Sequence, residues 1–137
     1  PEGWIAQAAT EPWTDDTSVL VGFHPSGDIL YDSVLRDHLF LTIASQPIGD
    51  STPEEWVADG LASEGCSATE PIAVDGAAGL IATNCDAGVA AVTTDGRGYF
   101  FHLRRSDDDP SATSAYDRAW FEVVLATVRL HPKDAVD

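Results

Sequence analysis

The chain of 137 residues contains no methionine, a single lysine and only two cysteines. It also lacks any apolar run close to the roughly 18 residues that a membrane-spanning helix needs, so we do not expect it to insert into a membrane. The opening residues Pro1 to Trp4 form neither a basic nor an apolar leader. We therefore expect a mature or trimmed piece of an exported protein, anchored, if at all, through a missing N-terminal segment.

Basic residues are scarce throughout the chain. Lysine and arginine together number 7 against 23 aspartates and glutamates, which gives a formal net charge of −16. A negative field of this size repels phosphate backbones and anionic headgroups, which excludes nucleic acid as a partner. The acidity indicates ordinary solubility or, alternatively, adaptation to high salt or attraction of cations.

The length and composition are those of one globular domain. Apolar residues make up 44% of the chain and charged residues 22%, both close to the average for folded proteins. A domain of this size buries enough surface to fold without a metal. We predict a single domain over residues 1–137.

Strand signals dominate the middle of the sequence. Residues 39–44 alternate apolar side chains on one face, and four short strand-like segments follow over residues 72–74, 80–83, 89–93 and 99–104. Asp75-Gly76 and Asp95-Gly96 are dipeptides typical of tight turns. This part of the chain therefore predicts an antiparallel meander.

Two helices are predicted, near 52–64 and 112–128. The first has Thr52 at its N-cap, Pro53 at the first helical position and Glu55 where a capping box needs its carboxylate. The second is amphipathic, with Trp120, Val123 and Val124 on its apolar face, and is predicted to pack on the sheet through Trp120 and Val124. Strands grouped in this way favour an α+β fold, with a central, mainly antiparallel β-sheet flanked by helices.

The two cysteines, Cys66 and Cys85, are predicted to form a disulfide. Such a bridge would contribute roughly 3 kcal/mol by closing the loop between them. Two buried free thiols, or a reactive thiol, are the alternatives. A disulfide would indicate an oxidising, extracytoplasmic compartment.

Motifs for catalysis and metal binding are missing. The sequence has no G-x-S-x-G elbow, and its four histidines lack the short spacing to cysteine that a zinc site needs. Asp107–Asp109 indicates a solvated loop before a helix or, alternatively, a cation site. We therefore expect no catalytic residue, no bound metal and no cofactor, and we do not expect an enzyme.

Three aromatic residues are candidates for ligand binding. Trp4 and Trp13 flank a weakly structured opening, where each would either join the core or line a groove. Phe100 lies on the outer face of its predicted strand, where a solvated sheet needs no aromatic side chain. The predicted partner is a protein or a small molecule.

Several short motifs resemble the PsbP-like family of bacterial exported proteins and lipoproteins. They are the opening Pro1–Trp4, the strand end Ser45–Pro47, the helix start Pro53–Trp56, the turn Val74–Gly76 and the closing helix at Ala119–Phe121. The resemblance implies an α/β/α sandwich, in which a long closing helix packs on an antiparallel sheet. It implies no catalytic or metal-binding residue in this chain.

The expected function is that of a non-catalytic extracytoplasmic binding or accessory domain, from a bacterial lipoprotein or a membrane-anchored protein. One alternative is a small secreted hydrolase whose site is assembled from scattered residues. Another is an outward-facing sensor or assembly domain of a larger membrane protein. The missing catalytic motifs disfavour the hydrolase.

Overall fold

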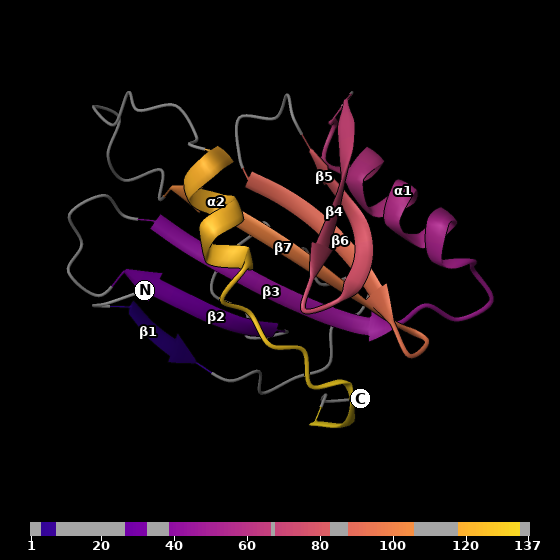
Figure 1. Ribbon diagram of the computed structural model, residues 1–137, viewed down its shortest axis with the longest axis horizontal. Helices are drawn as coiled ribbons and strands as arrows, with labels where there is room; N and C mark the ends of the chain where they lie inside the picture. Colours follow the sequence, from indigo (N-terminus) through magenta and orange to yellow (C-terminus); the bar gives the residue numbers. More distant parts are fainter. Residues whose placement is uncertain are drawn as a thin grey trace.

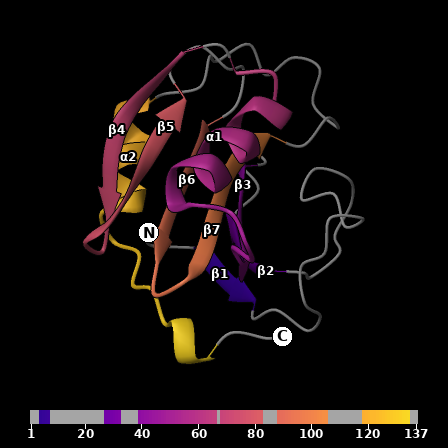
Figure 2. The ribbon, with the colours of Figure 1, turned by 90° about the vertical axis from the view of Figure 1, so that its right-hand side faces the viewer.

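The computed structural model of the chain describes residues 4–7, 27–32, 39–66, 68–82, 88–105 and 118–134. These residues form one antiparallel sheet with a helix on each of its faces (Figures 1 and 2). The elements in chain order are β1 (Trp4–Gln7), β2 (Gly27–Asp32), β3 (Leu39–Pro47), α1 (Pro53–Ser63), β4 (Thr69–Val74), β5 (Ala77–Ala82), β6 (Gly88–Thr94), β7 (Arg97–Arg105), α2 (Arg118–Leu125) and a short 3₁₀ turn, η1 (Pro132–Asp134).

The seven strands are arranged in the order β1-β2-β3-β7-β6-β5-β4, and each neighbouring pair is antiparallel. The chain leaves the middle of the sheet after β3, passes through α1 and re-enters at the far edge as β4. It then returns as a meander until β7 pairs with β3. The predicted α+β class and the predicted meander are both confirmed.

Two tight turns join the meander strands at the predicted dipeptides. Asp75 and Gly76 link β4 to β5 with φ angles of 49° and 84°, and Asp95 and Gly96 link β6 to β7 with 51° and 74°. A two-residue hairpin of type I′ needs positive φ at both positions, which Asp-Gly accommodates at low cost. Turn chemistry therefore sets the register of both hairpins.

Helix α1 begins with the predicted capping box. The backbone N–H of Glu55 donates to the Thr52 hydroxyl at 3.2 Å, and the Thr52 N–H donates to the Glu55 carboxylate at 2.9 Å. The helix ends at Ser63, and Gly65 follows with a φ of 72°, a conformation that favours glycine. The predicted helix near 52–64 is confirmed.

The sheet is buried on both faces where the two helices cover it. Along β6, Val89 and Ala91 belong to the cluster under α1, whereas Ala90 and Val92 belong to the cluster under α2. All four side chains are 1% exposed or less. A strand buried on both faces reads as a continuous apolar run, which explains the sequence of β6.

Helix α2 packs on the sheet with its predicted face turned toward Phe121 and away from Val123. Its buried side chains are Phe121, Val124 and Leu125, while Trp120 is only partly buried and Val123 is 65% exposed. The predicted contact through Val124 is confirmed, and Trp120 also packs against the core cluster, but the fully buried Phe121 takes the central place assigned to Trp120. The described helix ends at Leu125, short of the predicted 128, and residues 112–117 lie outside the described residues.

Within the described part of the chain, neither helix is long and apolar enough to span a membrane.

Candidate binding surfaces

Phe100 lies in the core and not on a ligand-binding surface. Its side chain is 3% exposed and belongs to the cluster between α1 and the sheet. A methyl group added at Gly60 of α1 would come within 3.6 Å of the Phe100 ring, so the helix passes directly over this side chain. The interpretation of Phe100 as an outer-face residue is wrong, because α1 covers the face of β7 that was taken to be open.

The two tryptophans predicted to bind a ligand are not brought together with Phe100. Trp4 begins β1, where its backbone pairs with Asp32 of β2. In the sheet order, β2 and β3 separate β1 from β7, which carries Phe100. Trp13, like the side chain of Trp4, lies outside the described residues.

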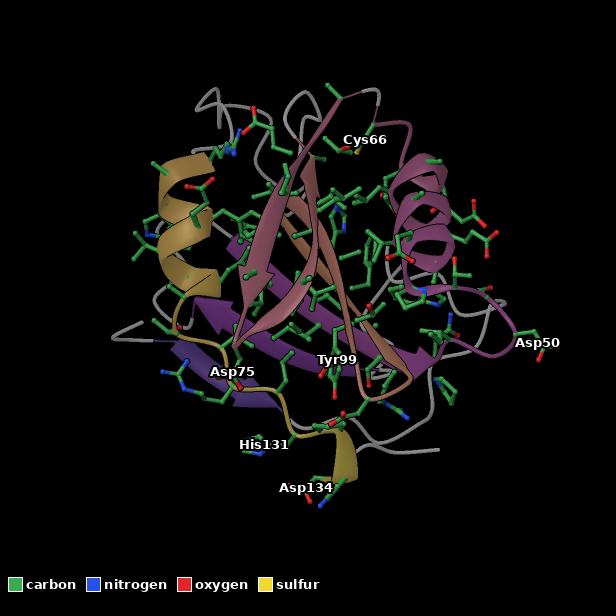
Figure 3. All side chains as sticks on the ribbon, turned by 45° about the vertical axis from the view of Figure 1, so that its right-hand side comes forward. Asp50, Cys66, Asp75, Tyr99, His131 and Asp134 are labelled. Carbon is green, nitrogen blue, oxygen red and sulfur yellow. The ribbon has the colours of Figure 1, made fainter. Side chains whose placement is uncertain are left out.

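Cys66 follows the C-terminal end of α1 (Figure 3). It is disulfide-bonded. Cys85, the other cysteine of the chain, lies outside the described residues. Their pairing therefore stays a prediction.

The described histidines lie in different environments. His102 is on β7 and only 5% exposed, whereas His131 follows α2 and is exposed (Figure 3). His24, His38 and the acidic stretch 107–109 lie outside the described residues. Among the residues that the structure describes, no group of three histidine, cysteine or acidic side chains is placed to hold a metal ion.

The outward surface of α1 is acidic. No lysine or arginine occurs between Arg36 and Arg97, and the segment that contains α1 carries five acidic residues: Asp50, Glu54, Glu55, Asp59 and Glu64. The hydrogen bonds from Thr52 lower the pKa of Glu55. Partial burial raises the pKa of Glu64 at the C-terminal end of the helix, because desolvation disfavours the charged carboxylate.

An arginine on α2 ties the helix to the edge of the sheet. The Arg118 guanidinium donates to Glu70 of β4 at 2.7 Å and to Glu122, one turn further along α2, at 2.8 Å. This contact lowers the pKa of Glu70 and raises the pKa of Arg118, because each charged form is stabilised by its partner. All three side chains are in contact with solvent, so the network orients α2 more than it stabilises the fold.

The solvent side of α2 carries a row of aliphatic side chains. Ala119, Val123 and Ala126 are all exposed. Ala126 directly follows α2 and its N–H still donates to the Glu122 carbonyl, so the spacing of four and three residues places all three on one stripe. Val123 is the one large exposed hydrophobic residue in the described part of the chain. We call these three residues the α2 outer row. The sequence interpretation missed it, because it assigned Val123 to the buried stripe.

The turn between β4 and β5 holds the segment that follows α2. The N–H of Leu130 donates to Oδ2 of Asp75 at 3.0 Å, and Nε of Arg129 lies 3.8 Å from Oδ1 of the same carboxylate. Leu130 also packs against the core cluster under α2. Asp75 therefore positions the C-terminal segment (Figure 3).

A buried arginine joins β7 to β3 on the face that α2 covers. Arg97 is 6% exposed, and its Nε donates to the Ser45 hydroxyl at 3.0 Å. A second guanidinium nitrogen lies 3.4 Å from the Ser45 carbonyl oxygen. Because burying a charge is costly without partners, these contacts give Arg97 a structural role.

Comparison with known proteins gave no match to a family model, to a curated protein or to a solved structure.

Proposed function

We propose that this chain is a non-catalytic extracytoplasmic binding or accessory domain, and that a protein partner packs against the α2 outer row. The observation that carries the proposal is the position of Val123 in the middle of a helix whose opposite face is fully packed. Covering an exposed aliphatic side chain is favourable, at about 25 cal/mol for each Å² removed from water. A partner would supply that cover.

The shape of this surface favours a protein over a small molecule. Small-molecule sites are concave and enclose most of the ligand. The α2 outer row lies on the convex side of a helix, where its small side chains suit close packing against another helix or sheet. The Arg118–Glu122 ion pair borders the row and would form part of a polar rim.

The compartment is inferred from Cys66. A disulfide persists in an oxidising environment and is rare in the cytosol. The bond therefore supports an exported domain that acts outside the cytoplasm, either secreted or anchored at the cell surface.

We also propose that the finer architecture is that of the PsbP-like family. A helix on each face of an antiparallel sheet and a helix after the last strand support this assignment. An experimental structure that superposes on a PsbP-like domain strand for strand would establish it. A different strand order in the matching region would overturn it and leave the binding proposal intact.

The binding proposal is tested by site-specific photo-crosslinking in the cells that naturally produce the protein. A photoreactive phenylalanine analogue is placed at residue 123, and in a matched control at Ala58, an exposed residue of α1. We expect the probe at residue 123 to give a discrete crosslinked protein that the probe at residue 58 does not give. With the probe at residue 119 instead, we expect the same crosslinked protein, and we expect the additional substitution Val123→Lys to suppress it. Equal crosslinking from residues 123 and 58, or none from either, would contradict the proposed surface.

The non-catalytic part of the proposal has a separate test. The purified domain is screened against a broad panel of hydrolase and transferase substrates, together with its His102→Ala and Asp75→Gly variants. We expect no turnover. Activity that one variant abolishes, while its circular dichroism spectrum stays native, would show that the domain is an enzyme, and hydrolysis of a substrate would favour the secreted hydrolase.

A further inference from the structure

Strand β4 is the last strand of the sheet, so one of its long sides has no neighbouring strand among the residues that the structure describes (Figure 2). An open edge displays unpaired backbone N–H and C=O groups and is a template for pairing with a second chain. Its residues Thr69, Pro71 and Ala73 are all exposed.

The hairpin register determines which backbone groups of β4 point outward. Val74 pairs with Ala77 directly at the two-residue turn, and such a closing pair exchanges both of its backbone hydrogen bonds. Bonded and non-bonded pairs then alternate along the strand. Ile72 therefore bonds inward to β5, whereas residues 69, 71 and 73 direct their backbone groups to the open edge.

Proline occupies the middle one of these three outward positions. Pro71 pairs with Leu80 in the register but has no N–H to contribute on either side. At this position the hairpin loses no hydrogen bond. The open edge, in contrast, loses the donor between Thr69 and Ala73, and the pyrrolidine ring stands where a neighbouring strand would approach.

We propose that Pro71 prevents a second copy of this chain from pairing with the β4 edge. The proposal goes beyond the binding function, because it concerns self-association and not the partner of α2. It follows that the domain stays free of strand-to-strand dimers at this edge and is left to bind through other surfaces.

The test restores the missing donor without adding apolar surface. Pro71→Thr supplies an N–H and a residue that favours strands. Sedimentation velocity over a range of concentrations measures the self-association constant, and we expect it to rise about tenfold or more over that of the wild type. Pro71→Ala supplies the same N–H and replaces the threonine variant if that variant fails to fold by circular dichroism.

A rescue variant distinguishes the β4 edge from every other surface. Pro71→Thr/Ala73→Pro returns a proline to an outward-facing position of the same strand, and we expect it to be as weakly associating as the wild type. Pro71→Thr/Thr69→Pro serves the same purpose if proline at 73 disturbs the hairpin. The proposal is overturned if Pro71→Thr and Pro71→Ala associate no more than the wild type, or if the rescue variants remain associated.

Discussion

The six-membered ring of Trp56 rests against Gly98, on the strand beneath α1. A Cβ atom on residue 98 would come within 2.5 Å of three atoms of that ring, closer than packed atoms allow. Trp56 is itself only 9% exposed and belongs to the cluster that holds α1 on the sheet. The absence of a side chain at 98 therefore determines how close the helix lies to β7.

We predict that Gly98→Ala destabilises the protein. The added methyl group must displace the Trp56 ring or the helix, and overpacking of this kind costs about 1–3 kcal/mol. Urea unfolding followed by tryptophan fluorescence measures the loss. In a Trp56→Ala background the same substitution is expected to be close to neutral, because the two residues are in contact and their effects couple.

Gly60→Ala is the matched control for this prediction. A Cβ at residue 60 would lie 3.6 Å from the Phe100 ring, an ordinary packing distance. Because glycine in a helix interior is less favourable than alanine by about 0.5–1 kcal/mol, we expect a gain in stability. Destabilisation by Gly60→Ala as large as that by Gly98→Ala would show that α1 lies closer to the sheet than described.

We predict that Phe121 contributes more to stability than any other side chain of α2. It is 0% exposed, so truncation to alanine is expected to cost about 3–5 kcal/mol. Trp120→Ala is expected to cost less, because that side chain is only partly buried. Val123→Ala should stay within about 0.5 kcal/mol of the wild type. A larger loss of stability from Val123→Ala than from Phe121→Ala would show that Val123, and not Phe121, faces the sheet.

Local chemistry explains which parts of the fold were predictable. The capping box around Thr52 and the turn at Asp75 each act within four residues along the chain, so the sequence alone indicates them. The bounds of α1 and the meander follow from such signals. The pairing of β3 with β7 does not, because it joins segments far apart in the chain.

The candidate surfaces depended on such long-range contacts. Phe100 is buried because α1 crosses its strand, and no signal near residue 100 indicates that crossing. Asp75 binds the N–H of Leu130 across 55 positions of sequence. The sequence around Val123 has the apolar spacing of an amphipathic helix. Apolar residues occur on both sides of that stripe, so the sequence does not determine which of them face the sheet.

We predict that Cys66 is bonded to Cys85. Denatured, unreduced protein should take up no thiol-alkylating reagent, and reduced protein should take up two equivalents, as read by intact mass. Since the bond restricts the unfolded chain, reduction is expected to lower stability by roughly 3 kcal/mol. Cys66→Ser should expose one reactive thiol at residue 85. Two alkylated cysteines without reduction would contradict both the bond and the extracytoplasmic assignment.

We predict that Glu64→Gln stabilises the protein at neutral pH. Burial raises the pKa of Glu64 above its ordinary value of 4.5, so the folded protein holds the proton of this carboxyl more tightly than the unfolded chain does. Glu64 therefore contributes its full stability below pH 4.5, the pKa of the unfolded chain. This contribution is lost as the pH rises through the higher pKa of the folded protein. The gain at pH 7 should be below about 1 kcal/mol, because water screens a half-exposed carboxylate. Thermal unfolding from pH 3 to pH 7 measures it, and the two proteins should converge at pH 3.

Glu55 gives the opposite pH dependence and serves as the control. Its pKa is lowered by the hydrogen bonds from Thr52, so its contribution is present above the ordinary pKa and is lost as pH falls through the folded one. Glu55→Ala should therefore destabilise the protein at pH 7, and the difference from the wild type should shrink toward pH 3. At pH 3 the Glu64 carboxyl and the glutamine that replaces it are both neutral. If the gain in stability from Glu64→Gln persisted unchanged at that pH, ionisation would not be its cause, and helix propensity or packing would explain it instead.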